Sequence, residues 1–506
     1  MKKIVLVGVN AKYIHTNLAI RSLKKATQRD DVILCEVTIN DQIHNITEKL
    51  LHFDADAYGF SCYIWNMEMI VKIGEVLKKS KPECYIFWGG PEVSYDSGLL
   101  LEKYTFVDYI LAGEGEGVFL EFLEALEKGD SHSLECMGGS QRKTLSIVEN
   151  LDDLRFPYSE HDIEVCKGKI IYYESMRGCP FKCSYCLSST LKTVRFLPLA
   201  RVFKEIDFFI DRGVKQVKFV DRTFNVNLKR TKTLIAYLIK RGGHTNFHFE
   251  ISGDLLDDEL IDLIGQAPKG LMQFEIGVQS TDENTLAAIT RKTDLEKIRL
   301  NVCRLIKIGN CHVHMDLIAG LPYESYNVFK KSFNETIDIK PDMLQLGFLK
   351  LLKGTKIRDE KEEHGYAFTS FPPYEVISNQ YISAKELVRL KNIETLLERY
   401  YNSGDFKLSL NYIFGEKLYG TPFDFFEKYA DFWLAKGYYE VGKSKDQLYE
   451  ILINYMRETV LESKVMLIIE LIKFDYLNNG CRSLPAFFEN NTLRKEEAFD
   501  FLKEMD

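Results

Sequence analysis

Short apolar runs alternate with amphipathic stretches over the first quarter of the chain. Five runs, each followed by apolar residues at helical spacing, lie at residues 3–9, 32–39, 57–64, 84–90 and 108–116. Strands that alternate with helices form parallel sheets, so the pattern predicts an α/β domain with a doubly wound parallel sheet over residues 1–128. Ligands of such sheets bind outside the carboxyl ends of the strands.

Residues 129–168 lose this periodicity and predict a linker with room for a small hairpin. The alternation of strand and helix then returns over residues 169–375. Six runs carry it, at 169–179, 214–221, 246–254, 272–280, 311–320 and 342–351. Six such units suit a complete or partial TIM-type (β/α)6 barrel, whose chemistry would lie at the carboxyl ends of its strands.

Helical spacing takes over in residues 376–506. A capping-box pattern runs from Ser383 to Glu386 ahead of an apolar stripe. Thr421 and Pro422 predict a further helix start, and Gly437 predicts its end. We therefore expect an all-helical carboxy-terminal domain, to which no chemical motif assigns a role.

The composition is that of a soluble globular protein, with 45% hydrophobic and 28% charged residues among 506. A formal charge of -8 argues against a nucleic-acid partner. No run reaches the roughly 18 apolar residues of a membrane span. Eight of the eleven cysteines are scattered, several of them in strand-like runs, and do not form a secreted disulfide framework, so we expect a cytoplasmic protein.

Three cysteines stand close together where the second strand–helix region begins. Cys179, Cys183 and Cys186 lie in the stretch RGCPFKCSYC with the spacing Cys-x3-Cys-x2-Cys. A structural zinc site has four protein ligands, and the nearest extra candidates, His161 and Cys166, are not at knuckle spacing. Three thiolates on a [4Fe–4S] cluster leave one iron open to an outside ligand. A closed zinc or iron–sulfur site with a fourth ligand from elsewhere is the alternative.

This motif resembles the signature of the radical S-adenosylmethionine (SAM) enzymes, which carry it after the first strand of a partial barrel. The resemblance implies an oxygen-sensitive [4Fe–4S] cluster whose open iron chelates SAM. It also implies a one-electron cleavage of SAM to a 5'-deoxyadenosyl radical, and an electron donor such as flavodoxin or ferredoxin.

Polar residues near the ends of later strands resemble the SAM contacts of coproporphyrinogen-oxidase-type members. The resemblance implies SAM contacts for Tyr185, Asp221, Glu250, Gln279, Arg291 and Asp316. An acidic side chain can accept the ribose hydroxyls, and an arginine can pair with the methionine carboxylate. The stretch around Asp221 departs from the family's GGE strand, which receives the methionine amine. Salt bridges at the barrel rim are the alternative for each residue.

The first domain resembles the cobalamin-binding domain that precedes the barrel in a large subclass of these enzymes. The matching positions imply a cobalamin site at Lys12, Ser61, Gly89, Gly90, Gly113 and Glu114. Glycines there would let the backbone approach the corrin edge or the nucleotide tail. The alternative is ordinary strand-to-helix turns, in which Glu114 and Glu116 favour a helix amino-terminus.

The loop after the first strand differs from that of methionine-synthase-like cobalamin domains, which carry Asp-x-His-x-x-Gly. Residues 10–15 read Asn-Ala-Lys-Tyr-Ile-His, so Lys12 stands where the histidine would be. We expect no histidine below the cobalt, with His15 a ligand only if the loop shifts.

Taken together, the resemblances imply a cobalamin-dependent radical SAM enzyme, most often a methyltransferase that acts on an unactivated carbon of a small-molecule substrate. One alternative is a non-methylating cyclisation or oxidation in which cobalamin carries electrons. The other is a non-catalytic iron–sulfur sensor that holds SAM or cobalamin. The sequence does not name the substrate.

Overall fold

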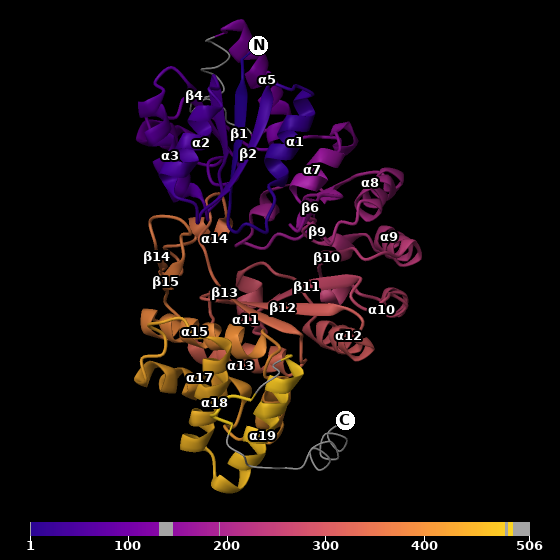
Figure 1. The fold of residues 1–506 in the computed structure, drawn as a ribbon, viewed down its shortest axis with the longest axis vertical. Coiled ribbons are helices and arrows are strands. Elements are labelled where there is room, and N and C mark those ends of the chain that lie inside the picture. The colour runs from indigo at the N-terminus through magenta and orange to yellow at the C-terminus, as the bar shows by residue number, and fades with distance from the viewer. Residues whose placement is uncertain (1, 131–144, 192, 481–483, 489–506) are drawn as a thin grey trace. The chain divides into compact units, whose positions relative to one another are not determined.

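A computed structural model describes residues 2–130, 145–191, 193–480 and 484–488 (Figure 1). The chain divides into two compact units whose segments alternate along the sequence. The first unit comprises Met1–Gly277, Leu286–His312 and Leu349–Ile377. The second comprises Val278–Thr285, Val313–Phe348 and Ser378–Asp506.

The amino-terminal domain is the expected five-stranded parallel sheet, in the order β2-β1-β3-β4-β5. Its strands are β1 (Ile4–Asn10), β2 (Val32–Thr38), β3 (Ala57–Ser61), β4 (Tyr85–Gly89) and β5 (Tyr109–Leu111). The helices are α1 (Leu18–Thr27), α2 (Ile43–His52), α3 (Met67–Ser80), α4 (Ser97–Lys103) and α5 (Gly115–Lys128). The strand order reverses between β1 and β3, which is the switch point where such folds bind ligands.

Alternate residues of β1 pack into two separate cores, one on each face of this sheet. Val5 and Val7 pack in one core with residues of α2 and α3, and Leu6 packs in the other with residues of α1 and α5. Figure 1 shows these two helix pairs on opposite sides of the sheet. All seven residues of β1 are buried, as a central parallel strand requires.

The part of the linker that the structure describes contains a helix and no hairpin. The 3-10 turn η1 (Leu151–Asp153) precedes α7 (Glu160–Val165). Ser159 and Asp162 form a capping box at the start of α7. Residues 131–144, over which the hairpin prediction also extended, lie outside the described residues.

Six parallel strands follow, each succeeded by helical or irregular segments, as the partial barrel requires. β6 (Ile171–Tyr173), β9 (Gln216–Phe219), β10 (Asn246–Ile251) and β11 (Met272–Gln279) pair in that order in the first unit. β12 (His312–Ala319) and β13 (Met343–Phe348) pair in the second. The intervening helices are α8 (Leu199–Asp211), α9 (Leu228–Arg241), α10 (Asp258–Gly265), α11 (Glu283–Ala288), α12 (Leu295–Ile308) and α13 (Tyr326–Ile337).

Smaller elements complete the barrel region. β7 (Met176–Arg177) and β8 (Arg195–Phe196) form a two-stranded antiparallel ribbon. After β13 come α14 (Lys356–Asp359) and a pair of strands, β14 (Ala367–Phe368) and β15 (Val376–Ser378). Strand structure thus continues slightly beyond the predicted start of the helical tail at residue 376.

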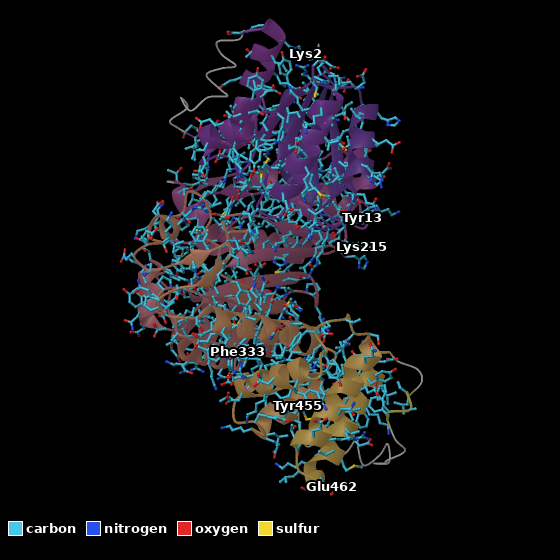
Figure 2. All side chains as sticks on the ribbon, turned by 90° about the vertical axis from the view of Figure 1, so that its left-hand side faces the viewer. Lys2, Tyr13, Lys215, Phe333, Tyr455 and Glu462 are labelled. Atoms are coloured by element: carbon cyan, nitrogen blue, oxygen red, sulfur yellow. The ribbon has the colours of Figure 1, made fainter. Side chains whose placement is uncertain are left out.

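The tail is helical, as expected. Its elements are α15 (Ala384–Leu396), the π-turn η5 (Leu397–Tyr401), α16 (Lys407–Gly415), α17 (Pro422–Ala435), α18 (Lys445–Thr459) and α19 (Glu462–Asn478). Ser383 and Thr421 both cap helices as predicted, and Gly437 follows the end of α17 with φ of 67°. Within this unit, Phe333 of α13, labelled in Figure 2, packs on Phe423 with ring centroids 5.3 Å apart.

None of the described helices is long and apolar enough to cross a bilayer.

Candidate functional site

The cysteine loop, residues 178–191, leaves the β7–β8 ribbon at the carboxyl end of β6. Gly178 opens it with φ of 99°, and a Cβ there would lie 2.2 Å from the Thr193 carbonyl oxygen. Only glycine fits that position. Cys183 is buried, whereas Cys179 and Cys186 are partly exposed.

Arg291 lies against the middle of this loop. Its Nη1 is 3.7 Å from the Cys183 sulfur and 3.4 Å from the Tyr185 hydroxyl, and its Nη2 donates to the Gly277 carbonyl oxygen. Burial raises the pKa of the Cys183 thiol, while the Arg291 charge opposes the rise. Burial also raises the pKa of Tyr185. The structure therefore brings together three residues that the sequence placed at the cluster and SAM site.

Two buried polar atoms in this region have no hydrogen-bond partner among the described residues: Arg291 Nε and Ser184 Oγ. Unpartnered buried donors cost folding free energy unless a ligand satisfies them. A guanidinium and a hydroxyl beside a thiol suit an anionic group. The loop thus fits a thiolate-bound cluster carrying a carboxylate-bearing ligand.

Among the described residues, no three His, Cys, Asp or Glu side chains gather as they would around a single metal ion. A four-iron cluster makes a different demand, because each thiolate binds its own iron. The three cysteines lie on one short loop, which suits such a cluster.

Glu250, at the end of β10, is partly exposed and lies 3.8 Å from Arg222. Burial raises the pKa of the Glu250 carboxyl, and Arg222 opposes the rise. Gln279 is the last residue of β11, whose end from Val278 on belongs to the second unit, and Asp316 of β12 belongs to the same unit. Gln279 Oε1 is buried without a hydrogen-bond partner among the described residues. SAM contacts for these residues stay predictions.

Asp221 has a place inside the fold that differs from the predicted SAM contact. It is fully buried, and its carboxylate accepts hydrogen bonds from the Ser175 N–H at 2.8 Å, the Ser175 hydroxyl at 2.5 Å and the Met176 N–H at 3.1 Å. Burial raises the pKa of Asp221 to about 7. Asp221 thus fixes the turn between β6 and β7, and its contact with SAM stays a prediction.

The glycines of the predicted cobalamin site are explained in part by contacts within the protein. A Cβ on Gly90 would lie 2.6 Å from the Cys62 carbonyl oxygen, and one on Gly113 would lie 2.4 Å from the Ser146 nitrogen. A Cβ on Gly89 would make only ordinary contacts. The Ser61 hydroxyl is buried and accepts from Asn17 at 2.9 Å.

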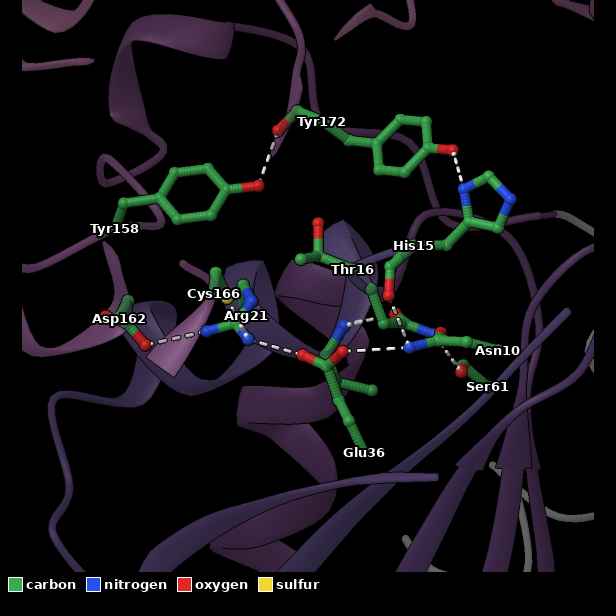
Figure 3. A network of polar contacts seen from close by, with 12 residues as sticks. Asn10, His15, Thr16, Arg21, Glu36, Ser61, Tyr158, Asp162, Cys166 and Tyr172 are labelled. Carbon is green, nitrogen blue, oxygen red and sulfur yellow. Dashed lines mark hydrogen bonds and ion pairs between the residues drawn. The ribbon is translucent and has the colours of Figure 1, made fainter. Parts of the chain in front are cut away.

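The loop after β1 is tied to the barrel strand β6 (Figure 3). His15 Nδ1 lies 2.7 Å from the Tyr172 hydroxyl, and Asn10 Nδ2 donates to the His15 carbonyl oxygen at 3.0 Å. Burial, with the Lys12 and Lys218 charges, lowers the pKa of His15. His15 is thus held by Tyr172 in this conformation, and Lys12 is exposed.

Behind this loop, a buried Arg21 joins the domain to the linker helix (Figure 3). Arg21 pairs with Glu36 of β2 and, at 2.7 Å, with Asp162 of α7, and it lies 3.2 Å from the Cys166 sulfur. Cys166 is therefore buried beside the ion pairs of Arg21.

The loops at the switch point also expose large apolar side chains. Tyr13 and Ile14 after β1 are 75% and 45% exposed, and Trp65 after β3 is 48% exposed. A broad, flat ligand such as a corrin ring would cover surface of this kind. The sheet edge therefore fits cobalamin in its chemistry.

Glu114 does not stand free at that edge. Its carboxylate forms a bidentate pair with Arg195 at 2.6 and 2.9 Å, contacts Arg177 at 3.0 Å and accepts from the Val148 N–H at 2.7 Å. Although burial opposes it, the nearby Arg195 and Arg177 charges leave the pKa of Glu114 below its usual value.

A second buried pair joins the loop after β4 to the segment after β13. Glu92 is 3% exposed, pairs with Lys353 at 3.3 Å and accepts from the Tyr374 hydroxyl. The loops after β1, β4 and β5 are thus all bound to barrel segments within the first unit.

Two family models match the two regions just described. The B12 binding domain model matches residues 4–123, and the Radical SAM superfamily model matches residues 173–335. The chain is a radical SAM protein with an amino-terminal B12-binding domain. A third model, Protein of unknown function (DUF4080), matches residues 362–506.

Curated relatives of this radical SAM protein include two enzymes. The cobalamin-dependent radical SAM methyltransferase TokK of Streptomyces tokunonensis is 26% identical over 375 residues, or 67% of this chain and 53% of TokK. The anaerobic magnesium-protoporphyrin IX monomethyl ester cyclase of Rubrivivax gelatinosus is 22% identical over 340 residues, or 63% of this chain and 61% of that protein. The chain spans about half the length of TokK.

The fold has a solved counterpart. The structure of the cobalamin-dependent S-adenosylmethionine radical enzyme OxsB with aqua-cobalamin and S-adenosylmethionine bound matches with a TM-score of 0.61 at 15% identity. The match covers 100% of this chain and 83% of that chain. It confirms the predicted fold class, with sheet, barrel and helical tail.

Sequence reasoning missed the residues that join the domains. Arg177 and Arg195 flank the cysteine loop, and Lys353 and Tyr374 follow the last barrel strand. The one feature of the sequence that could have indicated them is Arg177, directly before Gly178 and Cys179. Besides the nearby Glu174, its partners Glu114 and Glu116 lie 61 or more residues away in the first domain, where no local pattern indicates them.

Proposed function

We propose that this radical SAM protein is a cobalamin-dependent enzyme that cleaves SAM at a [4Fe–4S] cluster and methylates an unactivated carbon of a small molecule. The observation that carries the proposal is the construction of the first unit. Within it, a three-cysteine loop with a buried arginine is joined by buried ion pairs to the ligand edge of a B12-binding sheet.

Cys179, Cys183 and Cys186 would hold the cluster, and the sheet edge at the β1–β3 switch point would hold cobalamin. When bound, the cluster supplies an electron to SAM and the cobalamin supplies a methyl group. Arg291 would pair with the SAM carboxylate, since its charge is buried and one of its donors is unused. Glu250 would accept ribose hydroxyls, and fixed loops would keep the two sites close together.

A non-methylating cyclisation or oxidation is the second candidate. It is favoured by the similarity to a magnesium-protoporphyrin IX monomethyl ester cyclase, which covers nearly as much of the chain as the similarity to TokK. A non-catalytic sensor that holds SAM or cobalamin is the third. An electron donor such as flavodoxin or ferredoxin and a cytoplasmic location belong to the proposal.

Anaerobic protein reconstituted with iron, sulfide and cobalamin tests the proposal when it is given a reductant and SAM labelled in its methyl group. Formation of 5'-deoxyadenosine supports an enzyme and excludes the sensor. With the true substrate, equal amounts of S-adenosylhomocysteine and 5'-deoxyadenosine and a labelled product support methyl transfer. Turnover with an unlabelled product and no S-adenosylhomocysteine would remove methyl transfer and support the second candidate.

A further inference from the structure

Five charged residues meet where the β7–β8 ribbon closes the base of the cysteine loop. This Glu114 junction consists of Glu114, Glu116, Glu174, Arg177 and Arg195. Its members are 9% to 24% exposed, which is low for charged side chains. Two of its carboxylates, those of Glu114 and Glu116, come from the B12-binding domain, at the start of α5.

The two arginines of the junction lie directly opposite each other. Arg177 and Arg195 are register partners in the antiparallel ribbon, one immediately before the loop and one just after it. Like charges at such positions repel and would open the ribbon. The carboxylate of Glu114 contacts both guanidiniums, at 3.0 Å and 2.6 Å.

The two arginines differ in their other partners. Arg177 also pairs with Glu174 at 2.7 Å and Glu116 at 2.9 Å. In the described residues, Arg195 pairs with Glu114 as its anion and otherwise donates to the Val148 carbonyl oxygen. Removing the Glu114 charge would thus leave Arg195, 9% exposed, without a counterion beside a second cation.

We propose that Glu114 is a positioning residue that closes the base of the cysteine loop from the B12-binding domain. It fixes the geometry of the three thiols relative to the cobalamin edge. This role replaces the predicted contact of Glu114 with cobalamin. The effect of Glu114 on catalysis rests on the proposed function. The closure of the cysteine loop does not, because its ion pairs are formed by the protein alone.

Hydrogen exchange in the full chain without cofactors tests the closure directly. In Glu114→Gln, amides of residues 176–191 should exchange about tenfold faster or more, because the ribbon opens more often. The matched control is Glu36→Gln, which breaks another buried Arg–Glu pair in the same domain without touching the cysteine loop (Figure 3). Equal protection of the loop in wild type and Glu114→Gln would overturn the proposal.

A double variant separates positioning from a general loss of stability. Glu114→Gln with Arg195→Gln removes one charge of each sign and the repulsion across the ribbon. It should recover most of the loop protection that Glu114→Gln loses. No recovery would overturn the proposal, because a merely structural or cobalamin-contacting Glu114 would not be rescued by changing Arg195.

Pulsed electron paramagnetic resonance on reconstituted protein extends the test to the cofactors. The distance distribution between the reduced cluster and Co(II) should be broader in Glu114→Gln than in wild type. Turnover should fall about 100-fold, the effect of a misplacement of about 1 Å. Weaker cobalamin binding with unchanged loop protection would overturn the proposal and restore the cobalamin contact. If reconstituted wild type bound neither the cluster nor cobalamin, the proposed function would be wrong. The hydrogen-exchange result would still decide whether Glu114 closes the loop.

Discussion

At the residue scale, the side chains that the sequence predicted as site residues are those that match a family motif. Cys183 and Arg291 are 108 residues apart, and only the resemblance to a known family placed them together before the structure did. The contact of Glu114 with cobalamin, which the same resemblance implied, stays a prediction. In the structure its carboxylate pairs with Arg177 and Arg195, whose approach depends on tertiary packing that no local pattern indicates.

Replacing Cys183 tests the cluster assignment. Cys183→Ala should lose the cluster, since two thiolates cannot hold a site built for three. Iron and sulfide content and the resonance spectrum of the reduced protein measure the loss. Cys303→Ala, at an exposed cysteine on α12, should retain wild-type iron. Full iron content in Cys183→Ala, or one tightly held zinc per wild-type chain, would contradict the assignment.

Arg291→Lys tests how SAM is held. Lysine keeps the positive charge beside Cys183 but lacks the forked donors, so SAM affinity should fall about tenfold while the cluster is retained. Equilibrium binding of SAM to the oxidised protein measures the affinity, and iron analysis provides the control. An unchanged affinity would remove the pairing of Arg291 with the SAM carboxylate.

At the element scale, helix caps formed by neighbouring residues could be predicted from the sequence, whereas a cap supplied by a distant residue could not. The capping boxes of α15 and α17 involve residues three apart, so Ser383 and Thr421 could be recognised from the sequence. The helix α16 begins without a local side-chain cap. Asp475 of α19 takes that role, accepting from the N–H groups of Leu408 and Ser409, each at 2.9 Å, and from the Ser409 hydroxyl.

The Asp475 cap predicts a pH dependence of the second unit. Burial raises the pKa of Asp475 from 3.8 to about 6 despite the hydrogen bonds it accepts. A raised pKa means that the folded state holds the proton more tightly than the unfolded chain does. The associated stability is present below pH 3.8 and is lost as the pH rises through about 6, a change of about 3 kcal/mol.

Denaturant unfolding of wild type and Asp475→Asn, followed by the circular dichroism of the helices, measures this effect. The difference in unfolding free energy between the two proteins should shift against the wild type between about pH 4 and about pH 7. Asparagine does not titrate, so it removes the pH-dependent component and leaves a side-chain acceptor. A difference that stays constant across this range would contradict the prediction.

At the scale of the whole molecule, the sequence predicted the order of sheet, barrel and helical tail, and the structure adds how the tail is held. Asn402 bonds to both the nitrogen and the carbonyl oxygen of Leu344 on β13 at 2.9 Å. The Phe423 ring packs on Phe333 of α13, and the Phe423 N–H donates to Asn334 Oδ1 at 2.9 Å. The tail therefore packs on the last barrel strand, β13, and on α13, which the change from strand to helix pattern at residue 376 does not reveal.

Truncation tests this packing. A chain that ends at residue 376 should be insoluble or rapidly degraded, because Phe333 and the outer edge of β13 lose the side chains that cover them. Expression followed by limited proteolysis measures the outcome, with the full chain as the control. A soluble, protease-resistant fragment with wild-type iron content would show that the tail is dispensable for the fold.

The alternation of the two units along the chain limits how such a protein can be rearranged in evolution. The family model for the tail begins at residue 362, whereas the second unit also includes Val313–Phe348. Recombination of two genes at residue 362 would therefore build the core of the second unit from two different parent proteins. Exchange of tails between paralogues would leave mismatched surfaces on α13 and β13. We expect tails of this kind to diverge by substitution rather than by exchange as a whole domain.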